Sequence, residues 1–244
     1  MDMYQKRKIR AEKKNNDSQK SFSKVPISWF PGHMAKTRRQ ITEDLKMIDV
    51  VVEILDARIP NSSQNPDIRQ ITQNKKKIII LNKYDLADNA KTEKWIEYFN
   101  KKERKVVLAD SLTGKGVNET TRQIQKIMED EMQKMADKGR IGRKIRTMIV
   151  GIPNVGKSSF INRISKKTSA EVGNKPGVTK QKQWIRINEK IELLDTPGVL
   201  WPKFESQKVA MNLAITGTIK DDILELTEVA YTLTKFMLEN YRNN

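Results

Sequence analysis

Short apolar runs alternate along this chain with longer stretches in which apolar residues recur every three or four positions. Such runs are typical of parallel strands buried on both faces, and the spaced pattern is typical of helices with one buried side. The resulting strands are 48–55, 77–81, 105–109, 145–150, 182–188 and 190–195, and the helices are 36–46, 65–73, 91–102 and 117–135. The alternation predicts an α/β fold, with a mostly parallel six-stranded sheet flanked by helices.

The end of the chain departs from this alternation. Asn188 and Glu189 separate the last two expected strands by a tight turn, so these two strands should pair antiparallel. Residues 205–244 then show helical spacing without another strand, which predicts a short C-terminal helical segment outside the sheet. Its apolar positions are Val209, Leu213, Ile223, Leu224, Leu226, Val229, Leu233, Phe236 and Met237.

A phosphate-binding loop connects strand 145–150 to a helix that begins at Lys157. Residues 151–158 read G-x-x-x-x-G-K-S, in the strand, turn and helix context that this motif requires. Backbone N–H groups and the helix N-terminus would surround a β-phosphate, and Lys157 would reach the β and γ oxygens. Ser158 is the expected Mg²⁺ ligand. The expected phosphate-binding set is Pro153, Asn154, Val155, Gly156, Lys157, Ser158 and Ser159, joined by Thr179 and Gly198.

Thr179 and Gly198 belong to two further loops. Residues 195–198 read D-x-x-G at the end of a strand, where Asp195 would hold Mg²⁺ and the Gly198 N–H would contact the γ-phosphate. Thr179 lies in the polar loop 176–179, and it would bind Mg²⁺ through its hydroxyl and the γ-phosphate through its backbone N–H. A plain surface turn is the alternative for Thr179.

Residues 82–85 read N-K-Y-D directly after an apolar strand. The two oxygens of Asp85 match the N1–H and N2–H₂ donors of guanine and do not match the edge of adenine, which favours GTP over ATP. Asn82 would bind back to the phosphate loop, and the stem of Lys83 would cover the base. The expected guanine-binding set is Asn82, Lys83, Asp85, Asp110 and Ser111, the last two as weaker contacts in a loop that loosely matches the usual S-A dipeptide.

The guanine motif precedes the phosphate loop, whereas an ordinary G domain has the opposite order. This order predicts a circularly permuted P-loop GTPase domain, in which the connector 137–144 joins two ends that are usually free. The new ends lie just before strand 48–55 and just after residues 195–198. Switch II, the segment that begins with the D-x-x-G residues 195–198, therefore runs into residues 205–244, so the γ-phosphate state could move those residues directly.

Val199 occupies the position after D-x-x-G where Ras-like GTPases place a glutamine that orients water. A valine cannot orient a nucleophile, so intrinsic GTP hydrolysis should be slow. His33, the one histidine of the chain, lies in a Pro-Gly turn that the permutation brings near the γ-phosphate. We expect His33 to orient or deprotonate the attacking water, with a purely structural histidine as the alternative.

The 244-residue chain has a net charge of +17, a pI near 9.9 and no cysteine, so neither a disulfide nor a thiolate metal site is expected. No apolar run has membrane-spanning length and the N-terminus lacks a signal-peptide pattern, which predicts a cytoplasmic location. The charge implies a polyanionic partner, with nucleic acid as the first candidate. The basic head 1–24 should be disordered when free, although a merely solvated tail is the alternative.

Five motifs together resemble one known family: 29–34, 56–60, 82–85, 151–158, and 195–198 with 201–203. Over roughly residues 25–240 the chain is similar to ribosome biogenesis GTPase A, a family of circularly permuted assembly GTPases. The resemblance implies a ribosome-stimulated GTPase that binds the immature large ribosomal subunit, through rRNA and ribosomal proteins, late in assembly. It also implies that His33 is catalytic and that Asn154 binds K⁺ beside the phosphates, in addition to Mg²⁺.

The expected organisation is a basic head at 1–24, a permuted G domain at 25–204 and a helical segment at 205–244 that resembles a truncated helical domain. We expect a monomer without stable membrane association. Two other functions fit the residues: a nucleotide-gated RNA-binding module with negligible turnover, and a GTPase that acts at an anionic membrane surface. Residues 56–60 fit either a strand end and turn or a direct switch or RNA contact.

Overall fold

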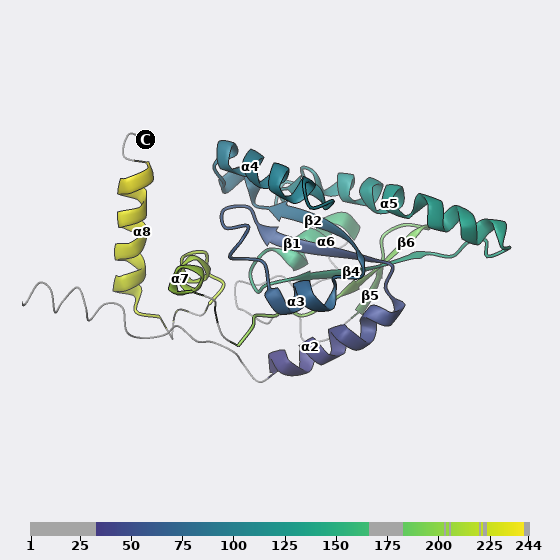
Figure 1. The fold of residues 1–244 in the computed structure, drawn as a ribbon, viewed down its shortest axis with the longest axis horizontal. Coiled ribbons are helices and arrows are strands. Elements are labelled where there is room, and N and C mark those ends of the chain that lie inside the picture. Colours follow the sequence, from purple (N-terminus) through teal and green to yellow (C-terminus); the bar gives the residue numbers. More distant parts are fainter. Residues whose placement is uncertain are drawn as a thin grey trace, which may run out of the picture.

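Six strands form one sheet within residues 33–165, 183–202, 204, 206–219, 221 and 224–241, which the computed structural model describes. Their order across the sheet is β3-β2-β1-β4-β6-β5 (Figure 1). Neighbouring strands are parallel except β5 and β6, which run antiparallel. The strands are β1 (Val50–Asp56), β2 (Lys76–Asn82), β3 (Lys105–Ala109), β4 (Ile145–Gly151), β5 (Gln183–Arg186) and β6 (Ile191–Asp195). The predicted mostly parallel sheet is therefore confirmed.

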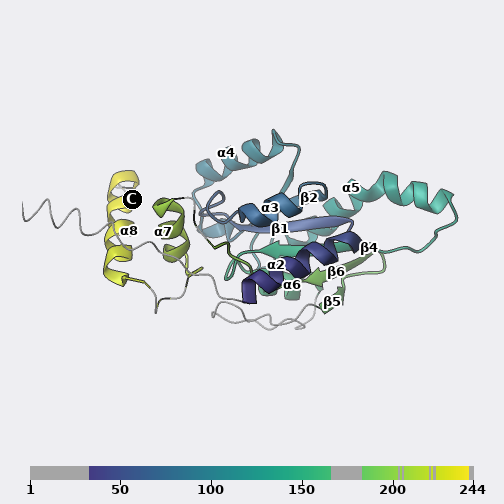
Figure 2. The same ribbon diagram turned by 60° about the horizontal axis from the view of Figure 1, so that its bottom comes forward.

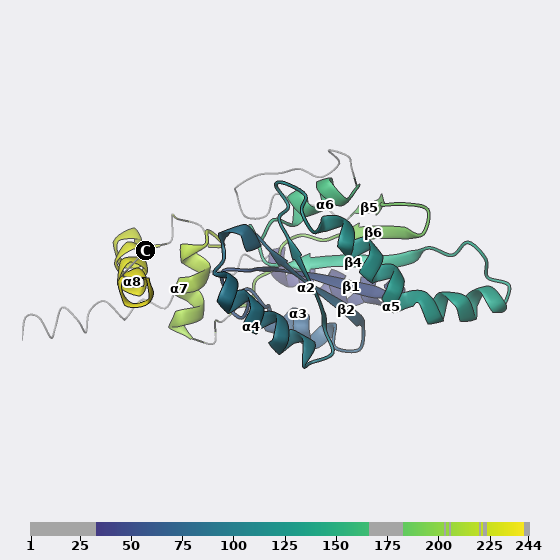
Figure 3. The same ribbon diagram turned by 90° about the horizontal axis from the view of Figure 1, so that it is seen from above.

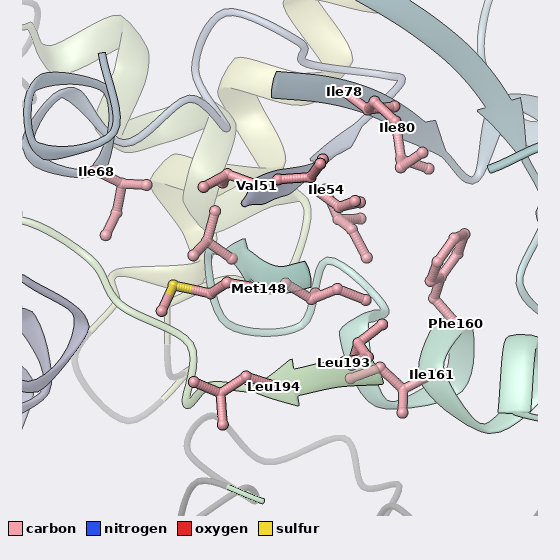
Figure 4. Packing of buried hydrophobic residues seen from close by; sticks show 14 of the residues in the cluster. Val51, Ile54, Ile68, Ile78, Ile80, Met148, Phe160, Ile161, Leu193 and Leu194 are labelled. Carbon is pink, nitrogen blue, oxygen red and sulfur yellow. The ribbon is translucent and has the colours of Figure 1, made fainter. Parts of the chain in front are cut away.

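Helices cover both faces of the sheet. They are α2 (His33–Asp44), α3 (Pro66–Ile71), α4 (Asn89–Asn100), α5 (Val117–Asp137), α6 (Lys157–Ser165), α7 (Gln207–Ile215) and α8 (Leu226–Asn240), with short 3-10 turns η1 (Leu45–Met47) and η2 (Tyr84–Leu86). Figure 4 shows Phe160 of α6 and Ile80 on one side of the strands, and Ile68 of α3 and Val51 on the other, all in one hydrophobic core. The central strands are buried between the two helical layers, as their continuous apolar runs predict.

Strand β5 ends before the end of the predicted strand 182–188. The side chain of Asn188 accepts hydrogen bonds from the N–H groups of Lys190 (2.8 Å) and Ile191 (2.9 Å). These bonds close a turn between β5 and β6, because an asparagine oxygen competes with the backbone ladder for N–H donors. The described part of β5 therefore ends at Arg186, before the predicted boundary.

The C-terminal helices α7 and α8 lie together at one end of the sheet, away from the end at which α5 projects (Figures 2 and 3). Helix α7 is anchored: Leu213 is fully buried, and Asn212 Nδ2 donates a hydrogen bond to Ser62 Oγ at 2.9 Å. Helix α8 has no buried side chain in the described structure. Beyond its end, Tyr241 donates from its hydroxyl to Asp88 Oδ2 at 2.9 Å, at the start of α4.

Glu53 and Lys77 form an ion pair at 3.1 Å inside the fold, between the adjacent strands β1 and β2. Their side chains are 2% and 7% exposed, so both charges are removed from water. A buried pair adds little net stability because desolvation offsets the attraction, but removal of one partner leaves an uncompensated buried charge.

Glu53→Ala should therefore lower the free energy of unfolding by about 3–5 kcal/mol, since the Lys77 ammonium would stay buried without its partner. A matched control is Glu119→Ala, because Glu119 pairs with Arg122 at the surface, where such pairs contribute about 0–1 kcal/mol. Urea denaturation followed by circular dichroism measures both variants. Equal losses in the two would contradict the burial argument.

Candidate functional site

The expected phosphate and guanine residues meet at the carboxyl ends of the parallel strands. Asp56 at the end of β1 is in register with Asn82 at the end of β2. Strand β4, the other neighbour of β1, leads into the phosphate loop, and β6 ends at Asp195. This edge of an open parallel sheet is where ligands bind. The sheet thus brings both halves of the predicted nucleotide site to one place.

The phosphate loop has a backbone that few side chains tolerate. Gly156 has a φ of +96°, and a Cβ added there would lie 2.3 Å from Asn82 Nδ2. Asn154 has a φ of +57°, a left-handed conformation that asparagine adopts more readily than most residues. Because α6 begins at Lys157, the loop ends at a helix N-terminus, whose N–H groups and dipole favour an anion.

Asn82 joins the guanine motif to the phosphate loop, as the sequence predicts. Its Nδ2 donates to the carbonyl oxygen of Val155 at 2.8 Å. Its Oδ1 accepts from the N–H of Ser111 at 3.2 Å and from the Ser111 hydroxyl at 2.7 Å. The side chain is 1% exposed, so these bonds satisfy a polar group that water does not reach. One asparagine therefore fixes three loops relative to one another.

Lys83 and Asp85 complete the guanine motif. Lys83 has a φ of +58°, and its Nζ donates to the carbonyl oxygen of Asn154 at 2.8 Å. Asp85 lies two residues further on, with its side chain exposed. The Lys83 ammonium is thus bound to the phosphate loop, whereas the Asp85 carboxylate is accessible to a ligand.

Asp110 and Ser111 support this site from the loop that follows β3. The Asp110 carboxylate accepts hydrogen bonds from the N–H groups of Leu112 (2.8 Å) and Thr113 (3.3 Å) and from the Thr113 hydroxyl. The hydroxyl bond of Thr113 is the largest of the influences that hold the pKa of Asp110 below its ordinary value. Asp110 therefore shapes its own loop and Ser111 braces Asn82, while their direct contact with guanine stays a prediction.

Lys157 and Asp195 place two buried charges under the phosphate loop, with 7% and 0% of their surface exposed. Burial lowers the pKa of Lys157 and raises the pKa of Asp195, and the charge of each residue opposes the shift of the other. Gly198 packs close by: an added Cβ would lie 2.9 Å from Pro153 N and 3.2 Å from Lys157 Nζ. The D-x-x-G loop therefore lies directly against the phosphate loop.

Asp195 also fits a divalent cation. Neither of its carboxylate oxygens has a hydrogen-bond partner among the described residues, although the side chain is fully buried. A buried carboxylate without partners suits Mg²⁺, which prefers oxygen ligands and is typical of GTPases. No group of three His, Cys, Asp or Glu side chains gathers within the described ranges, so oxygens of the nucleotide, of water and of Ser158 would complete the coordination.

Val199 continues the D-x-x-G loop into the core. Its side chain is 2% exposed, its N–H donates to the Gly151 carbonyl at 3.3 Å, and its own carbonyl accepts from Asn65 Nδ2 at 2.8 Å. Trp201, 3% exposed, follows and packs edge-on against Phe204 with ring centroids 5.3 Å apart. Position 199 is thus a packing position, which agrees with the expectation that it cannot orient water.

Two expected residues lie outside what the structure describes. Thr179 falls in the range 166–182, and only the backbone of His33 is described, at the first position of α2. The side chains of Met34 and Gln183 are likewise not described. The roles of Thr179 and His33 therefore stay predictions.

The structure adds two contacts that the sequence did not predict. Asn154 Nδ2 donates to the carbonyl oxygen of Gly217 at 2.6 Å, so the phosphate loop touches the turn after α7. Asp56 Oδ2 lies 3.4 Å from Lys83 Nζ, which links residues 56–60 to the guanine motif. The second contact had a signal in the sequence, because an aspartate ends one apolar strand just as Asn82 ends another.

A phosphate loop, a D-x-x-G loop and an N-K-x-D loop at one edge of a mostly parallel sheet define a P-loop GTPase. Because the N-K-x-D loop comes first in the chain, this is a circularly permuted member of the class.

Comparison with known proteins identifies the family. A profile described as "50S ribosome-binding GTPase" matches residues 146–242. Ribosome biogenesis GTPase A of Bacillus pumilus is 49% identical over 217 residues, which cover 89% of this chain and 77% of the relative. The Thermotoga maritima protein of the same name is 36% identical over 201 residues, covering 82% and 69%. Mitochondrial ribosome-associated GTPase 1 of Mus musculus is 36% identical over 229 residues, covering 87% and 68%.

Solved structures similar to this chain support the same family. GNP-bound YlqF from T. maritima superposes with a TM-score of 0.61 at 27% identity, covering 86% of this chain and 77% of that one. The GDP-bound form gives a TM-score of 0.58 at 27% identity, covering 82% and 75%. The chain belongs to the ribosome biogenesis GTPase A family, and it is a GTPase with a role in ribosome assembly.

Gly156→Ala should lower the affinity for GDP by at least about tenfold, because the new methyl group would displace Asn82 and the backbone would be strained. Gly139→Ala is the matched control: Gly139 also has a positive φ, +77°, but its Cβ would meet nothing within 4 Å. The control should cost about 1 kcal/mol of stability without loss of affinity. Fluorescent GDP titration and thermal unfolding measure the two effects, and equal affinities in both variants would refute the proposed contact.

Proposed function

We propose that this protein binds the immature large ribosomal subunit in its GTP form, hydrolyses GTP late in assembly when the particle stimulates it, and then dissociates. It acts in the cytoplasm as a monomer and contacts rRNA and ribosomal proteins. The profile named for 50S binding and the relatives named for ribosome biogenesis support the large subunit as partner. The net charge of +17 supports contact with rRNA phosphates.

The path of the chain from switch II to α7 is the observation that supports this proposal most directly. Gly198 lies against the phosphate loop, and the buried residues 199–201 lead from it toward α7. The turn after α7 returns to the phosphate loop, where Gly217 accepts the hydrogen bond of Asn154. A change at the γ-phosphate therefore has a short path to α7 and α8, so that nucleotide state can govern how the C-terminal helices meet a partner.

Within the site we assign each residue a task. Lys157 and the backbone N–H groups of residues 154–159 bind the phosphates, and Asp85 recognises guanine. Asn82 keeps the two loops at a fixed separation through its bond to Val155. Mg²⁺, when bound, neutralises charge on the phosphates, and its protein ligands would be Ser158, Thr179 and Asp195.

The hydrolytic step needs a group that Val199 does not provide, because its side chain is apolar and buried. We assign that task to His33, which would orient or deprotonate the attacking water. Asn154 would bind K⁺ through its amide oxygen, since its Nδ2 already donates to Gly217. A cation there would stabilise charge on the phosphates as an arginine finger does.

Two rival functions make different predictions. A nucleotide-gated RNA-binding module would bind large subunits without faster turnover. A GTPase of an anionic membrane surface would bind vesicles in preference to ribosomal particles. In the described part of the chain, no helix combines the length and the apolar character needed to span a bilayer.

Co-sedimentation with purified large subunits should retain the protein in a non-hydrolysable GTP analogue and release it in GDP. Subunits should raise GTP turnover at least about tenfold, and KCl should support faster turnover than NaCl at equal ionic strength. Retention without stimulation would favour the RNA-binding module, and binding to anionic vesicles but not to subunits would favour the membrane role. Either result would overturn the proposal.

His33→Ala should leave GTP affinity nearly unchanged and lower subunit-stimulated turnover by about tenfold or more, the scale of a general base or water-orienting group. Lys36→Ala, an exposed position on the same helix, is the control and should keep the stimulated rate. Single-turnover hydrolysis with saturating subunits measures both variants. Equal stimulated rates in His33→Ala and the parent would remove His33 from the reaction.

A further inference from the structure

Asp56 is a buried acid at the nucleotide edge to which the proposed mechanism gives no task. It ends β1, lies in register with Asn82, and is 2% exposed. Its backbone N–H donates to Ser63 Oγ at 3.1 Å, while the Ser63 hydroxyl donates to the Ile59 carbonyl at 2.9 Å. The turn that follows the strand therefore holds Asp56 firmly in place.

The carboxylate of Asp56 binds two cations. Oδ1 accepts from the backbone N–H of Arg58 at 3.1 Å and from Arg58 Nε at 2.9 Å. Oδ2 accepts from a terminal guanidinium nitrogen of Arg58 at 2.6 Å and lies 3.4 Å from Lys83 Nζ. The two-pronged pair with Arg58 fixes the plane of the carboxylate, and that plane presents Oδ2 to Lys83.

Electrostatics keep this carboxylate ionised. Burial alone would raise the pKa of Asp56, but the hydrogen bonds and charge of Arg58, together with the charge of Lys83, hold it below its ordinary value. The pKa of Arg58 is raised, chiefly by its bond to Asp56 and with a further contribution from the charge of Asp85. The ion pair of Arg58 with Asp56 therefore stabilises the charged form of both side chains.

Lys83 is held from both halves of the permuted chain. Its Nζ contacts Asp56 Oδ2 from β1 and the carbonyl oxygen of Asn154 from the phosphate loop. Its backbone has a φ of +58°, which a lysine adopts at an energetic cost. A lysine side chain has high rotamer entropy when free, so two anchors on its ammonium order the stem before any ligand binds.

We propose that Asp56 is a positioning residue of the guanine subsite: with its carboxylate held by Arg58, it fixes the Lys83 ammonium, so that the lysine stem is already in place when a guanine nucleotide arrives. This inference rests on the proposed guanine-binding roles of Lys83 and Asp85. Preorganisation of this kind lowers the ordering cost of binding and acts equally on GDP and GTP.

Asp56→Asn tests the inference with little change of shape. Affinities for GDP and for a GTP analogue should fall by the same factor, at least about tenfold, while turnover at saturating GTP stays within about twofold of the parent. A role confined to folding of the turn would lower stability without this split between KM and kcat. Asp49→Asn is the matched control. Asp49 immediately precedes β1, at the end of the strand opposite Asp56, and it pairs with Arg143 at 2.7 Å. The control should keep the affinity of the parent.

A double-mutant cycle with Lys83→Met decides whether Asp56 acts through the lysine. In that background Asp56→Asn should change GDP affinity by less than about twofold; a full additive loss, or parental affinity in Asp56→Asn itself, would overturn the inference. If Asp56→Asn does not fold, Arg58→Gln replaces it in the cycle. Arg58→Gln should then lower GDP affinity in the parent and change it by less than about twofold in the Lys83→Met background. Asp85→Asn separately tests the guanine assignment, since it should shift preference from guanosine to xanthosine diphosphate whatever Asp56 does.

Discussion

The hydrogen bonds of the Asn82 side chain hold this nucleotide site together. The guanine motif and the phosphate loop are far apart in the sequence, so their relative position depends on tertiary contacts. Asn82 meets that need because it binds Val155 through its nitrogen and Ser111 through its oxygen. Gly156 is glycine for the same reason, since any larger side chain would occupy the space of the Asn82 amide.

The circular permutation also changes which segment of the chain follows the D-x-x-G loop. In this chain the D-x-x-G loop does not lead into the next strand of the sheet; it leads through buried Val199 and Trp201 to α7. The turn after α7 is bonded back to Asn154, and Tyr241 beyond α8 is bonded to Asp88 beside the guanine motif. The segment that carries α7 and α8 is therefore bonded to the phosphate loop through Gly217 and to the start of α4 through Tyr241. Among the described residues, α8 has no buried side chain, whereas α7 is anchored by Leu213.

Most of the fold could be predicted from the sequence because its strands are buried on both faces. Their apolar runs in β1, β2 and β4 locate the sheet, and the motifs at the strand ends locate the site. The contact of Asn82 with the phosphate loop followed from the motif. The short extent of β5 did not, because it depends on a side-chain bond of Asn188 that competes with the ladder. Asp56 at the end of an apolar strand was a partial signal for its link to Lys83, but the contact itself depends on strand register and on a left-handed lysine, which no sequence pattern predicts. The proposed division into head, G domain and helical segment stays a prediction.

Lys157 and Asp195 show how burial in this site favours a charged ligand. Both side chains are buried, and burial opposes the charged form of each, so the protein alone gives them a poor environment. A phosphate and a divalent cation bring the opposite charges into a space where water screens them weakly, so each attraction is stronger than at the surface. The free-energy cost of burying Lys157 and Asp195 arises when the protein folds, and the packing of the sheet core offsets it there. Ligand binding does not incur this cost again. The packing of β4 against β6 thus stabilises an arrangement of buried charges that favours nucleotide binding.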